Sequence, residues 1–288
     1  MEFLTYNLPE THRVYYISDF HEGTILQYSP GLEATIERIH DDPIGAVLIG
    51  GDLAEAIMID DKRYSSETLS KKADVPLLQY KEVIKKLRPI TNKTLAILIG
   101  NHDWKLVSRV GNLVKDYVCT ELGVPYGTYS VKLTINNPKG ELMYKSFYTH
   151  GAGNLYSCAD DPVRRLANMR LMLKRKLQHK FADCVLMGTG HNHKLVVLKP
   201  IPVLYLTSEG KEIQQYYTGS EQQAQYIHPD HRFYFSTGSF FKLYESGVSG
   251  YGELFGFDPH ELGYCIAHVE DGIVKDVTRE ILAMKGGA

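Results

Sequence analysis

The sequence predicts an α/β fold, and three observations support this prediction. Short apolar runs of strand length recur along the chain, and each one ends in glycine or a small polar residue. Segments with the apolar spacing of helices lie between these runs through residue 188. Such alternation of strand and helix is typical of α/β proteins, in which helices cover a sheet. The apolar runs lie at residues 14–17, 46–49, 95–99, 147–148 and 184–187.

Three helices are expected between these strands. Asp74 and Pro76 start the first and Pro89 ends it, because proline fits the first turn of a helix but not its interior. The second is expected at residues 112–123, where a final glycine stops it, and the third starts at Asp161-Pro162. The apolar residues expected to face the core are Leu77, Tyr80, Ile84 and Leu87 in the first helix, Val114, Val118 and Leu122 in the second, and Leu166, Met169, Leu173 and Leu177 in the third.

The rest of the chain is expected to be rich in strands. Residues 129–135 and 141–148 flank the turn sequence Asn-Asn-Pro-Lys-Gly, which predicts a β-hairpin. After residue 194, strands are expected at 196–198, 203–206 and 233–235. No repeat or linker divides the sequence, so we expect a single domain over residues 1–288. Its motifs lie in residues 13–194, and the strand-rich part 195–288 is expected to complete the fold.

Composition excludes several classes of protein. The chain has 288 residues, 43% of them hydrophobic, and a formal net charge of −2, which excludes disordered and collagen-like chains. An isoelectric point near 6.6 argues against binding of nucleic acid by bulk charge. The four cysteines lie far apart without C-x-x-C spacing. No basic start with an apolar run precedes residue 18, and no membrane span is present, so we expect a cytoplasmic protein.

Potential metal ligands follow each apolar run. Because the carboxyl ends of parallel strands meet at one edge of a sheet, these side chains can converge although they are distant in sequence. Oxygen and imidazole donors without thiolates suit manganese, with iron, zinc or nickel as alternatives. Any one of these short motifs alone is common by chance, whereas five in order at strand ends predict a metal site. The residues are Asp19 and His21, Asp52, Asn101 with His102 and Asp103, His150, and His191 and His193.

These five blocks resemble the calcineurin-like metallophosphoesterases, whose ordered motifs are D-x-H, G-D, G-N-H-[DE], H and G-H-x-H. The resemblance implies a four-layer αββα fold, a β-sandwich flanked by helices, and a site for two divalent metal ions. By position, Asp19, His21 and His193 would hold one ion, Asn101, His150 and His191 would hold the second, and Asp52 would bridge them. His102 would face the substrate, and Asp103 would orient its imidazole ring.

The chain also departs from part of that family. Protein phosphatases continue the second block as G-D-x-x-D-R-G, whereas Gly51-Asp52 continues here as Leu-Ala-Glu-Ala-Ile. The missing arginine argues against a phosphoprotein substrate. The insert at residues 53–78, the sequence Leu-Gly-Val-Pro-Tyr at 122–126 and Thr-Gly-Ser-Phe at 237–240 are similar to phage and prophage members of the family.

The predicted function is metal-dependent hydrolysis of a phosphoester. Two divalent ions and two carboxylates leave a charge of roughly +2, which attracts phosphate, and such ions can activate a bridging hydroxide for attack on phosphorus. We expect a phosphodiesterase acting on nucleic acid or a nucleotide, with Arg164, Arg165 and Arg170 as candidate phosphate contacts. The alternatives are a phosphomonoesterase for a small metabolite or nucleotide and a binding module without catalysis. The oligomeric state is left open.

Overall fold

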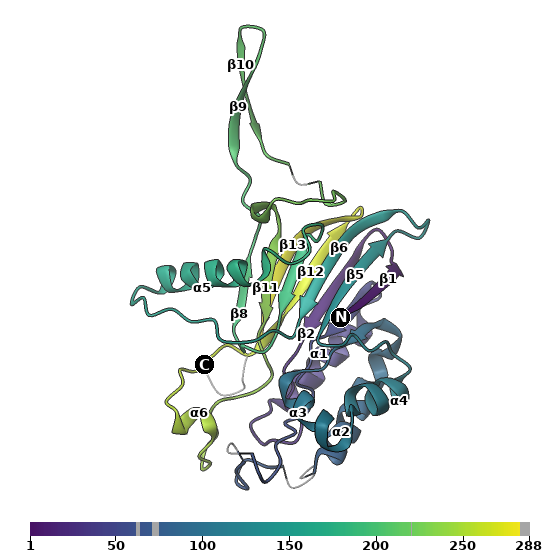
Figure 1. Ribbon diagram of the computed structural model, residues 1–288, viewed down its shortest axis with the longest axis vertical. Helices are drawn as coiled ribbons and strands as arrows, with labels where there is room; N and C mark the ends of the chain where they lie inside the picture. Colours follow the sequence, from purple (N-terminus) through teal and green to yellow (C-terminus); the bar gives the residue numbers. More distant parts are fainter. Residues whose placement is uncertain (62–63, 71–74, 220, 283–288) are drawn as a thin grey trace.

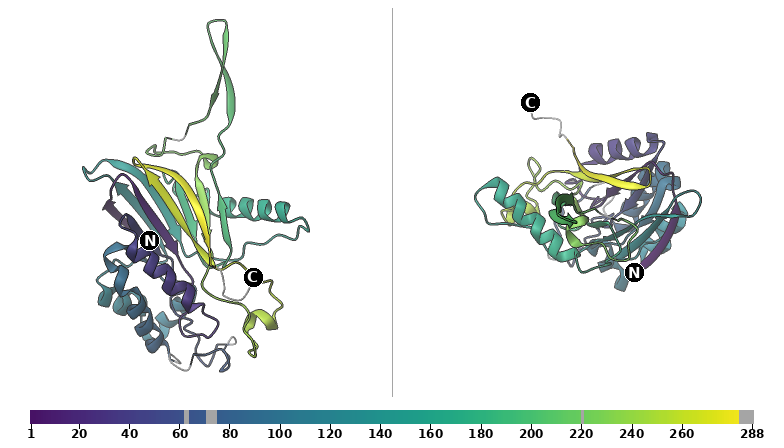
Figure 2. Two further views of the ribbon diagram at one scale, coloured as in Figure 1. Left: turned by 180° about the vertical axis from the view of Figure 1, so that it is seen from behind. Right: turned by 90° about the horizontal axis from the view of Figure 1, so that it is seen from above.

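The computed structural model has four layers, with two β-sheets packed face to face and helices on both outer sides (Figure 1). It describes residues 1–61, 64–70, 75–219 and 221–282. Seen from above, α5 flanks the strands on one side and α1 flanks them on the other (Figure 2). The expected α/β fold, and the αββα sandwich implied by the resemblance, are confirmed.

The first sheet has the strand order β1-β5-β6-β7-β11-β8. Strands β6, β7 and β11 run parallel to one another, so their carboxyl ends lie at one edge. The expected hairpin is present as the antiparallel pair β5 and β6. The strand bounds are β1 Glu2–Asn7, β5 Ser130–Asn136, β6 Leu142–Thr149, β7 Leu186–Thr189, β8 Leu195–Leu198 and β11 Phe233–Thr237.

The second sheet has the order β13-β12-β2-β3-β4. Strands β2, β3 and β4 are parallel, and β12 pairs with β2 in the antiparallel direction. The bounds are β2 His12–Ile17, β3 Gly45–Ile49, β4 Thr94–Ile97, β12 Gly263–Glu270 and β13 Ile273–Ile281. Strands β1, β12 and β13 add to those expected from the sequence.

The period of two along a strand divides the core into separate layers. Tyr16 of β2 lies between the sheets, where its ring centroid is 4.6 Å from that of Phe235 in β11 and 5.8 Å from that of Tyr148 in β6. Its neighbour Tyr15 points to the other face and packs in the core beneath the helices. Consecutive apolar residues in β2 are therefore buried on both sides, which explains the uninterrupted apolar run.

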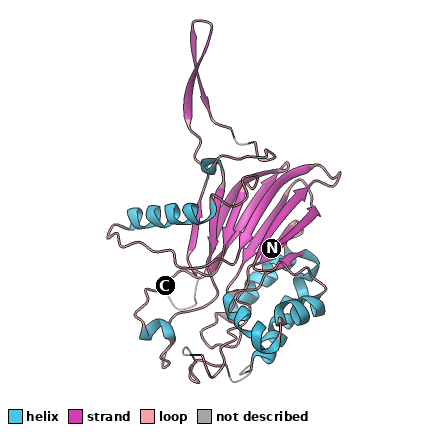
Figure 3. Cartoon of the chain, viewed as in Figure 1, coloured by secondary structure: helices cyan, strands magenta, loops and turns pink. Residues whose placement is uncertain are grey.

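The helices lie outside the strands (Figure 3). Most of them cover the second sheet, while α5 covers the first through Leu173 and Leu177. Ser29-Pro30 starts α1, and Asp161 caps α5 by accepting a hydrogen bond from Arg164 N at 2.7 Å. The bounds are α1 Ser29–Asp41, α2 Pro76–Leu87, α3 Asn101–Val110, α4 Thr120–Leu122 after a π-helical segment Val114–Cys119, α5 Pro162–Leu177 and α6 Tyr251–Leu254, with 3₁₀ turns at Arg88–Lys93 and Pro229–His231.

The helix predictions are confirmed with two corrections. Leu77 was expected to face the core, but it lies in the first turn of α2 with 47% of its surface exposed. The helix expected from Asn112 is π-helical for its first part, although Asn112 Oδ1 does accept a hydrogen bond from Lys115 N. Asp74, the expected start of α2, lies outside the described residues.

One expected strand lies outside the sandwich. Residues 203–206 were expected to help complete the fold, but they belong to β9 (Leu204–Glu209), which pairs only with β10 (Glu212–Tyr217). This hairpin projects from the end of the sheets (Figure 1). The part of residues 195–282 that completes the sandwich is therefore β8, β11, β12 and β13.

Candidate metal centre

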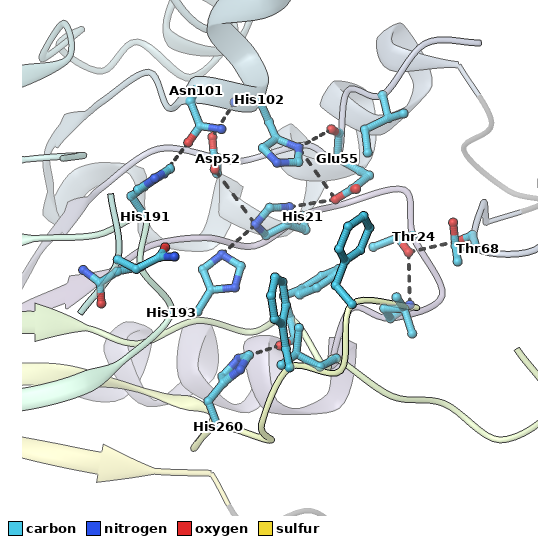
Figure 4. A pocket seen from close by; sticks show the side chains of 18 of the residues that line it. His21, Thr24, Asp52, Glu55, Thr68, Asn101, His102, His191, His193 and His260 are labelled. Carbon is cyan, nitrogen blue, oxygen red and sulfur yellow. Dashed lines mark hydrogen bonds and ion pairs between the residues drawn. The ribbon is translucent and has the colours of Figure 1, made fainter. Parts of the chain in front are cut away.

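The predicted ligands lie at the carboxyl ends of the central strands, where the two sheets meet. Asp19 and His21 follow β2, Asp52 follows β3 and Asn101 begins α3 after β4. From the other sheet, His150 follows β6, while His191 and His193 lie in the turn between β7 and β8. The labelled members of this set point toward one another in Figure 4. We call these seven residues the donor set.

The donor set forms two groups, and Asp52 of the second group lies next to His21 of the first. Ligand atoms of Asp19, His21 and His193 lie within 4.8 Å of one another, and so do those of Asp52, His150 and His191. Asp52 Oδ2 is 3.3 Å from His150 Nε2 and 4.0 Å from His21 Nε2, which places this carboxylate between the groups. A third group of possible ligand atoms joins His21 and Asp52 to His102, the residue that the family resemblance places toward the substrate.

Asn101 belongs to the second group. Its side-chain amide lies 3.0 Å from His150 Nε2 and 2.5 Å from His191 Nδ1. Its position is set by α3, because Asn101 is the first residue of that helix. An amide oxygen beside two ring nitrogens and a carboxylate is a ligand combination suited to a divalent first-row metal ion.

The unpaired groups of the first metal group fit a bound cation. Asp19 Oδ1 is buried and accepts no hydrogen bond from the described residues, although His193 Nε2 lies 3.3 Å away. His21 Nε2 and His193 Nε2 are only 3.2 Å apart. Buried carboxylates are costly unless paired with a cation, so these converging lone pairs fit a metal ion well.

Backbone strain is concentrated at the donor set. Five of its members have positive φ angles, with Asp19 at 58°, His21 at 51°, Asp52 at 48°, His191 at 69° and His193 at 54°. This left-handed conformation is uncommon for residues other than glycine and is found where surrounding structure enforces it, often at functional sites. The strained turns direct the five side chains inward at the strand ends.

Glycine allows the turns to approach each other closely. A Cβ atom at Gly100 would lie 2.1 Å from Asp52 Oδ1, so only glycine fits beside the Asp52 carboxylate. Gly51 has a φ of 97°, and a Cβ atom there would lie 2.6 Å from the backbone nitrogen of Gly100. The glycines in the G-D and G-N-H-D motifs thus have a steric role in bringing β3 and β4 together at the site.

The electrostatics of the donor set favour positive charge. Burial opposes protonation of His150, but the carboxylates of Asp52 and Asp19 prevail and raise the pKa of His150 to about 9. Burial would raise the pKa of Asp52, yet the rings of His150 and His102 hold it well below its usual range. The two buried carboxylates therefore stay ionised, as metal ligands must.

His102 is held by a group that the sequence did not indicate. Its Nδ1 lies 2.7 Å from the backbone carbonyl oxygen of Glu55, so Nδ1 donates the hydrogen bond. The carbonyl fixes the ring and leaves Nε2 as its second polar atom. His102 also lies near the first metal group, with its ring centroid 4.6 Å from that of His21.

Asp103 does not have the expected role of orienting His102. Within the described residues its carboxylate accepts hydrogen bonds from the backbone amides of Leu53, Ala54 and Gly100 and from Tyr80 Oη, and none from the His102 ring. The third position of α3 turns this side chain toward the start of the helix. Burial, followed by the charge of Asp52, raises the pKa of Asp103 to about 6.

Glu55 is a site residue that the sequence analysis missed. Its Oε2 lies 2.7 Å from His21 Nδ1, so the carboxylate accepts the ring proton and leaves Nε2 free to bind a metal ion. The Gly50 carbonyl has the same role for His150, since it lies 2.8 Å from Nδ1. An acidic residue three positions after Asp52 was the only signal, and surface glutamates commonly occur at such positions.

A cavity of about 590 Å³ opens beside the donor set. Its lining includes His21, Asp52, Asn101, His102, His191 and His193 together with a set of apolar and aromatic side chains. Among the described lining residues, Lys194 is the only lysine or arginine. The apolar and aromatic side chains are those of Leu26, Ile57, Tyr64, Tyr156, Phe241, Leu243, Leu254, Phe255 and Phe257.

The three arginines expected to contact phosphate lie outside this cavity. Arg164, Arg165 and Arg170 are on α5, and none of them lines it. Arg170 Nε donates a hydrogen bond to the backbone oxygen of Val197 at 2.9 Å, which fixes α5 to β8. A contact of these residues with a longer substrate stays a prediction.

Comparison with known proteins found matches among solved structures. No family model and no curated protein matches the chain. One solved structure that matches is the NAD nucleotidase NadN of Haemophilus influenzae, with a TM-score of 0.38 and 11% sequence identity. The match covers 94% of this chain and 50% of NadN, so the chain spans about half the length of that protein. No helix in the described part of the chain is long and apolar enough to cross a membrane.

Proposed function

We propose that this protein is a metal-dependent phosphoester hydrolase. The observation that carries the proposal is the convergence of seven nitrogen and oxygen donors from two sheets into two adjacent groups, with Asp52 between them. Bound at this position, two divalent ions would supply a water activated for attack and positive charge for the phosphoryl oxygens. Manganese is the proposed metal, because the donor set combines carboxylates, an amide and imidazoles without a thiolate.

The residues of the chain have separate tasks in this proposal. The donor set would hold the ions that position the phosphoryl group, and Asp52 lies between the two metal groups. In its imidazolium form His102 would carry a second proton at Nε2, in addition to the one that Nδ1 donates to the Glu55 carbonyl, and could pass it to the leaving oxygen. The apolar side chains of the cavity exclude water from the reacting groups and receive an organic arm of the substrate.

The cavity lining favours a phosphodiester over a monoester. A monoester dianion gains from arginine or lysine clamps, and Lys194 is the only such residue in the described lining. A diester has a single negative charge and two organic arms, which suits a site with an apolar wall. The volume of about 590 Å³ is in the range of small-molecule sites, so the proposed substrate is a nucleotide diester or one end of a nucleic acid.

A panel of substrates tests the proposal. The metal-free protein, prepared with chelator and reloaded with Mn²⁺, is assayed on bis(p-nitrophenyl) phosphate, p-nitrophenyl phosphate and a labelled oligonucleotide. We expect kcat/KM for the aryl diester to exceed that for the monoester by about tenfold or more. Faster hydrolysis of the monoester would favour the phosphomonoesterase alternative. Metal binding with no turnover of any substrate would favour the binding module.

A further inference from the structure

The hairpin of β9 and β10 stands apart from the rest of the fold. Its two strands pair antiparallel with each other and with no other strand of the described chain. It projects beyond the sheets, and a view from behind shows the same separation (Figures 1 and 2). It leaves the sandwich at the end of β8 remote from His193, so the metal centre lies at the opposite end of the sheet.

The two faces of the hairpin differ in chemistry. The register places Leu204 opposite Tyr217, Leu206 opposite Gln215 and Ile213 opposite Ser208, so these side chains share one face. We call Leu204, Leu206, Ile213 and Tyr217 the apolar face; their exposed fractions are 50%, 64%, 74% and 67%.

The other face carries the polar side chains, which contact one another within the hairpin. Tyr205 and Tyr216 pack across the strands with ring centroids 6.0 Å apart. Gln214 donates a hydrogen bond to Glu209 at 2.9 Å. Because charged and hydrogen-bonded side chains are confined to this side, the alternation is that of a strand pair with one face meant for water and one for a packed layer.

The hairpin buries too little surface to be stable by itself. An isolated two-stranded hairpin is marginal in water, and stability needs further strands or a layer packed on its apolar face. Every residue of β9 is exposed, and so is all of β10 except Gln214, which is partly buried. A surface packed on the apolar face would bury these exposed side chains and stabilise the hairpin.

We propose that the apolar face is the contact between two copies of this chain, with the same face of each hairpin packed together about a twofold axis. A symmetric contact requires a surface that complements itself. The apolar face carries no charged side chain, so two copies meet without repulsion between like charges. Glu209 and Glu212 lie on the opposite face, and Lys211 lies in the turn.

The area is consistent with a weak dimer. Each side chain of the apolar face offers on the order of 100 Å² of exposed surface, or about 400–500 Å² per copy. Two copies would bury about 900 Å², near the lower limit for specific interfaces. A reversible dimer with a dissociation constant in the micromolar range, roughly 1–100 µM, is expected. Nucleic acid is a poor alternative occupant, because residues 203–218 contain two glutamates and a single lysine.

Sedimentation velocity on the full-length protein tests the proposal with two matched variants. Leu206→Lys places a charge on the apolar face, and Thr207→Lys places the same charge on the adjacent residue, which faces the other way. For the wild type, we expect the dimer fraction to rise between about 1 and about 200 µM. Leu206→Lys should raise the dissociation constant at least about tenfold, while Thr207→Lys should leave it within about threefold.

Several outcomes would overturn the dimer. These are a wild type that stays monomeric at the highest concentration, equal effects of the two variants, or binding of the monomeric wild type to phosphatidylcholine vesicles through Leu206. Both residues lie outside the cores of the sandwich, so equal melting temperatures of the variants exclude misfolding as the cause. Phosphoester turnover should be the same in both variants, which separates this test from that of the proposed function.

Discussion

A histidine can bind a metal ion through one ring nitrogen when a hydrogen-bond acceptor holds the proton on the other. His21 and His150 each have such an acceptor at Nδ1, but the acceptors differ in chemistry. Glu55 accepts the proton of His21 Nδ1 with a carboxylate, whereas the Gly50 carbonyl accepts that of His150 Nδ1. A carboxylate partner also makes the ring a stronger donor to a cation. The Glu55 side chain is therefore expected to strengthen metal binding by His21, while the Glu55 backbone oxygen holds the His102 ring.

Removing the charge of Glu55 should weaken metal binding. In Glu55→Gln the amide still reaches His21 but no longer strengthens its ring as a ligand, so we expect Mn²⁺ affinity to fall roughly 10- to 100-fold in calorimetric titration. Glu22→Gln is the matched control, because Glu22 pairs with Lys86 instead of a donor ring. An equal loss in both variants would show that any lost carboxylate near His21 has this effect.

Replacing His102 should impair turnover without loss of metal. His102→Gln keeps a polar side chain but cannot donate a proton, so we expect kcat to fall roughly 10²- to 10⁴-fold while metal analysis still finds both ions. The defect should shrink for an aryl ester whose leaving group needs no proton. A constant defect across leaving groups would instead assign His102 to stabilisation of phosphoryl charge.

At the level of secondary structure, one ion pair connects the second sheet to the helical layer. Asp42 follows α1 and accepts hydrogen bonds from Arg13 of β2 at 2.6 and 2.7 Å and from Tyr15 at 2.8 Å. Burial opposes ionisation, but these donors prevail and lower the pKa of Asp42 to about 2, from a usual value of 3.8. Because the folded pKa is depressed, the stabilisation is present above the unfolded value and is lost as the pH falls.

Asp42 should therefore make stability depend on pH in acid. We expect Asp42→Asn to lower the free energy of unfolding by about 1–2 kcal/mol at neutral pH, a value that allows for the 37% exposed Arg13 side chain. The difference from wild type should disappear between about pH 4 and about pH 2. Urea unfolding with chelator present measures this, and Asp41→Asn, whose side chain is 70% exposed, is the control. A difference that stays constant down to pH 2 would contradict the assignment.

Because α5 lies outside the cavity, binding of a nucleic acid along this helix can be tested separately from hydrolysis in the cavity. Arg164→Glu with Arg165→Glu should leave kcat/KM for a small diester unchanged, since neither residue lines the cavity. If a nucleic acid extends along α5, KM for an oligonucleotide should rise, and the salt dependence of binding should weaken. Lys81→Glu with Lys115→Glu is the control on the other helical layer. Equal oligonucleotide kinetics in both double variants would exclude α5 as a phosphate contact.

The sequence predicted those elements whose burial leaves a clear pattern. Parallel strands such as β2 and β3 are buried on both faces and form continuous apolar runs, and their ends located the donor set. Strand β13 lies at the sheet edge and fully buries only Val274 and Val277, so it resembled a surface segment. The direction of Asp103 depends on where α3 starts, and the contact of Glu55 depends on how the turn after β3 folds back. Neither has a signal in local sequence.

Across the whole molecule, the metal centre joins the two sheets. The second sheet supplies Asp19, His21, Asp52 and Asn101 through the ends of β2, β3 and β4, and the first supplies His150, His191 and His193. In the metal-free chain the donor set brings two buried carboxylates close together at this junction. Bound ions would offset that charge and link the two sheets, which have no strand in common in the described part of the chain.

Metal binding should therefore stabilise the fold as a whole. At a Mn²⁺ concentration about 100 times the dissociation constant, linkage predicts about 2.7 kcal/mol, or a rise in Tm of roughly 5–10 °C by calorimetry. Asp52→Asn removes the carboxylate that lies between the two groups, so its Tm should respond little to Mn²⁺. Without metal its Tm should lie below that of the wild type, because the variant loses the attraction of Asp52 to His150 and His102, so the response of each protein to Mn²⁺ is compared with its own metal-free Tm. A wild-type Tm that does not change with Mn²⁺, or an equal rise in Asp52→Asn, would show that the donor set does not bind the ions that stabilise the fold.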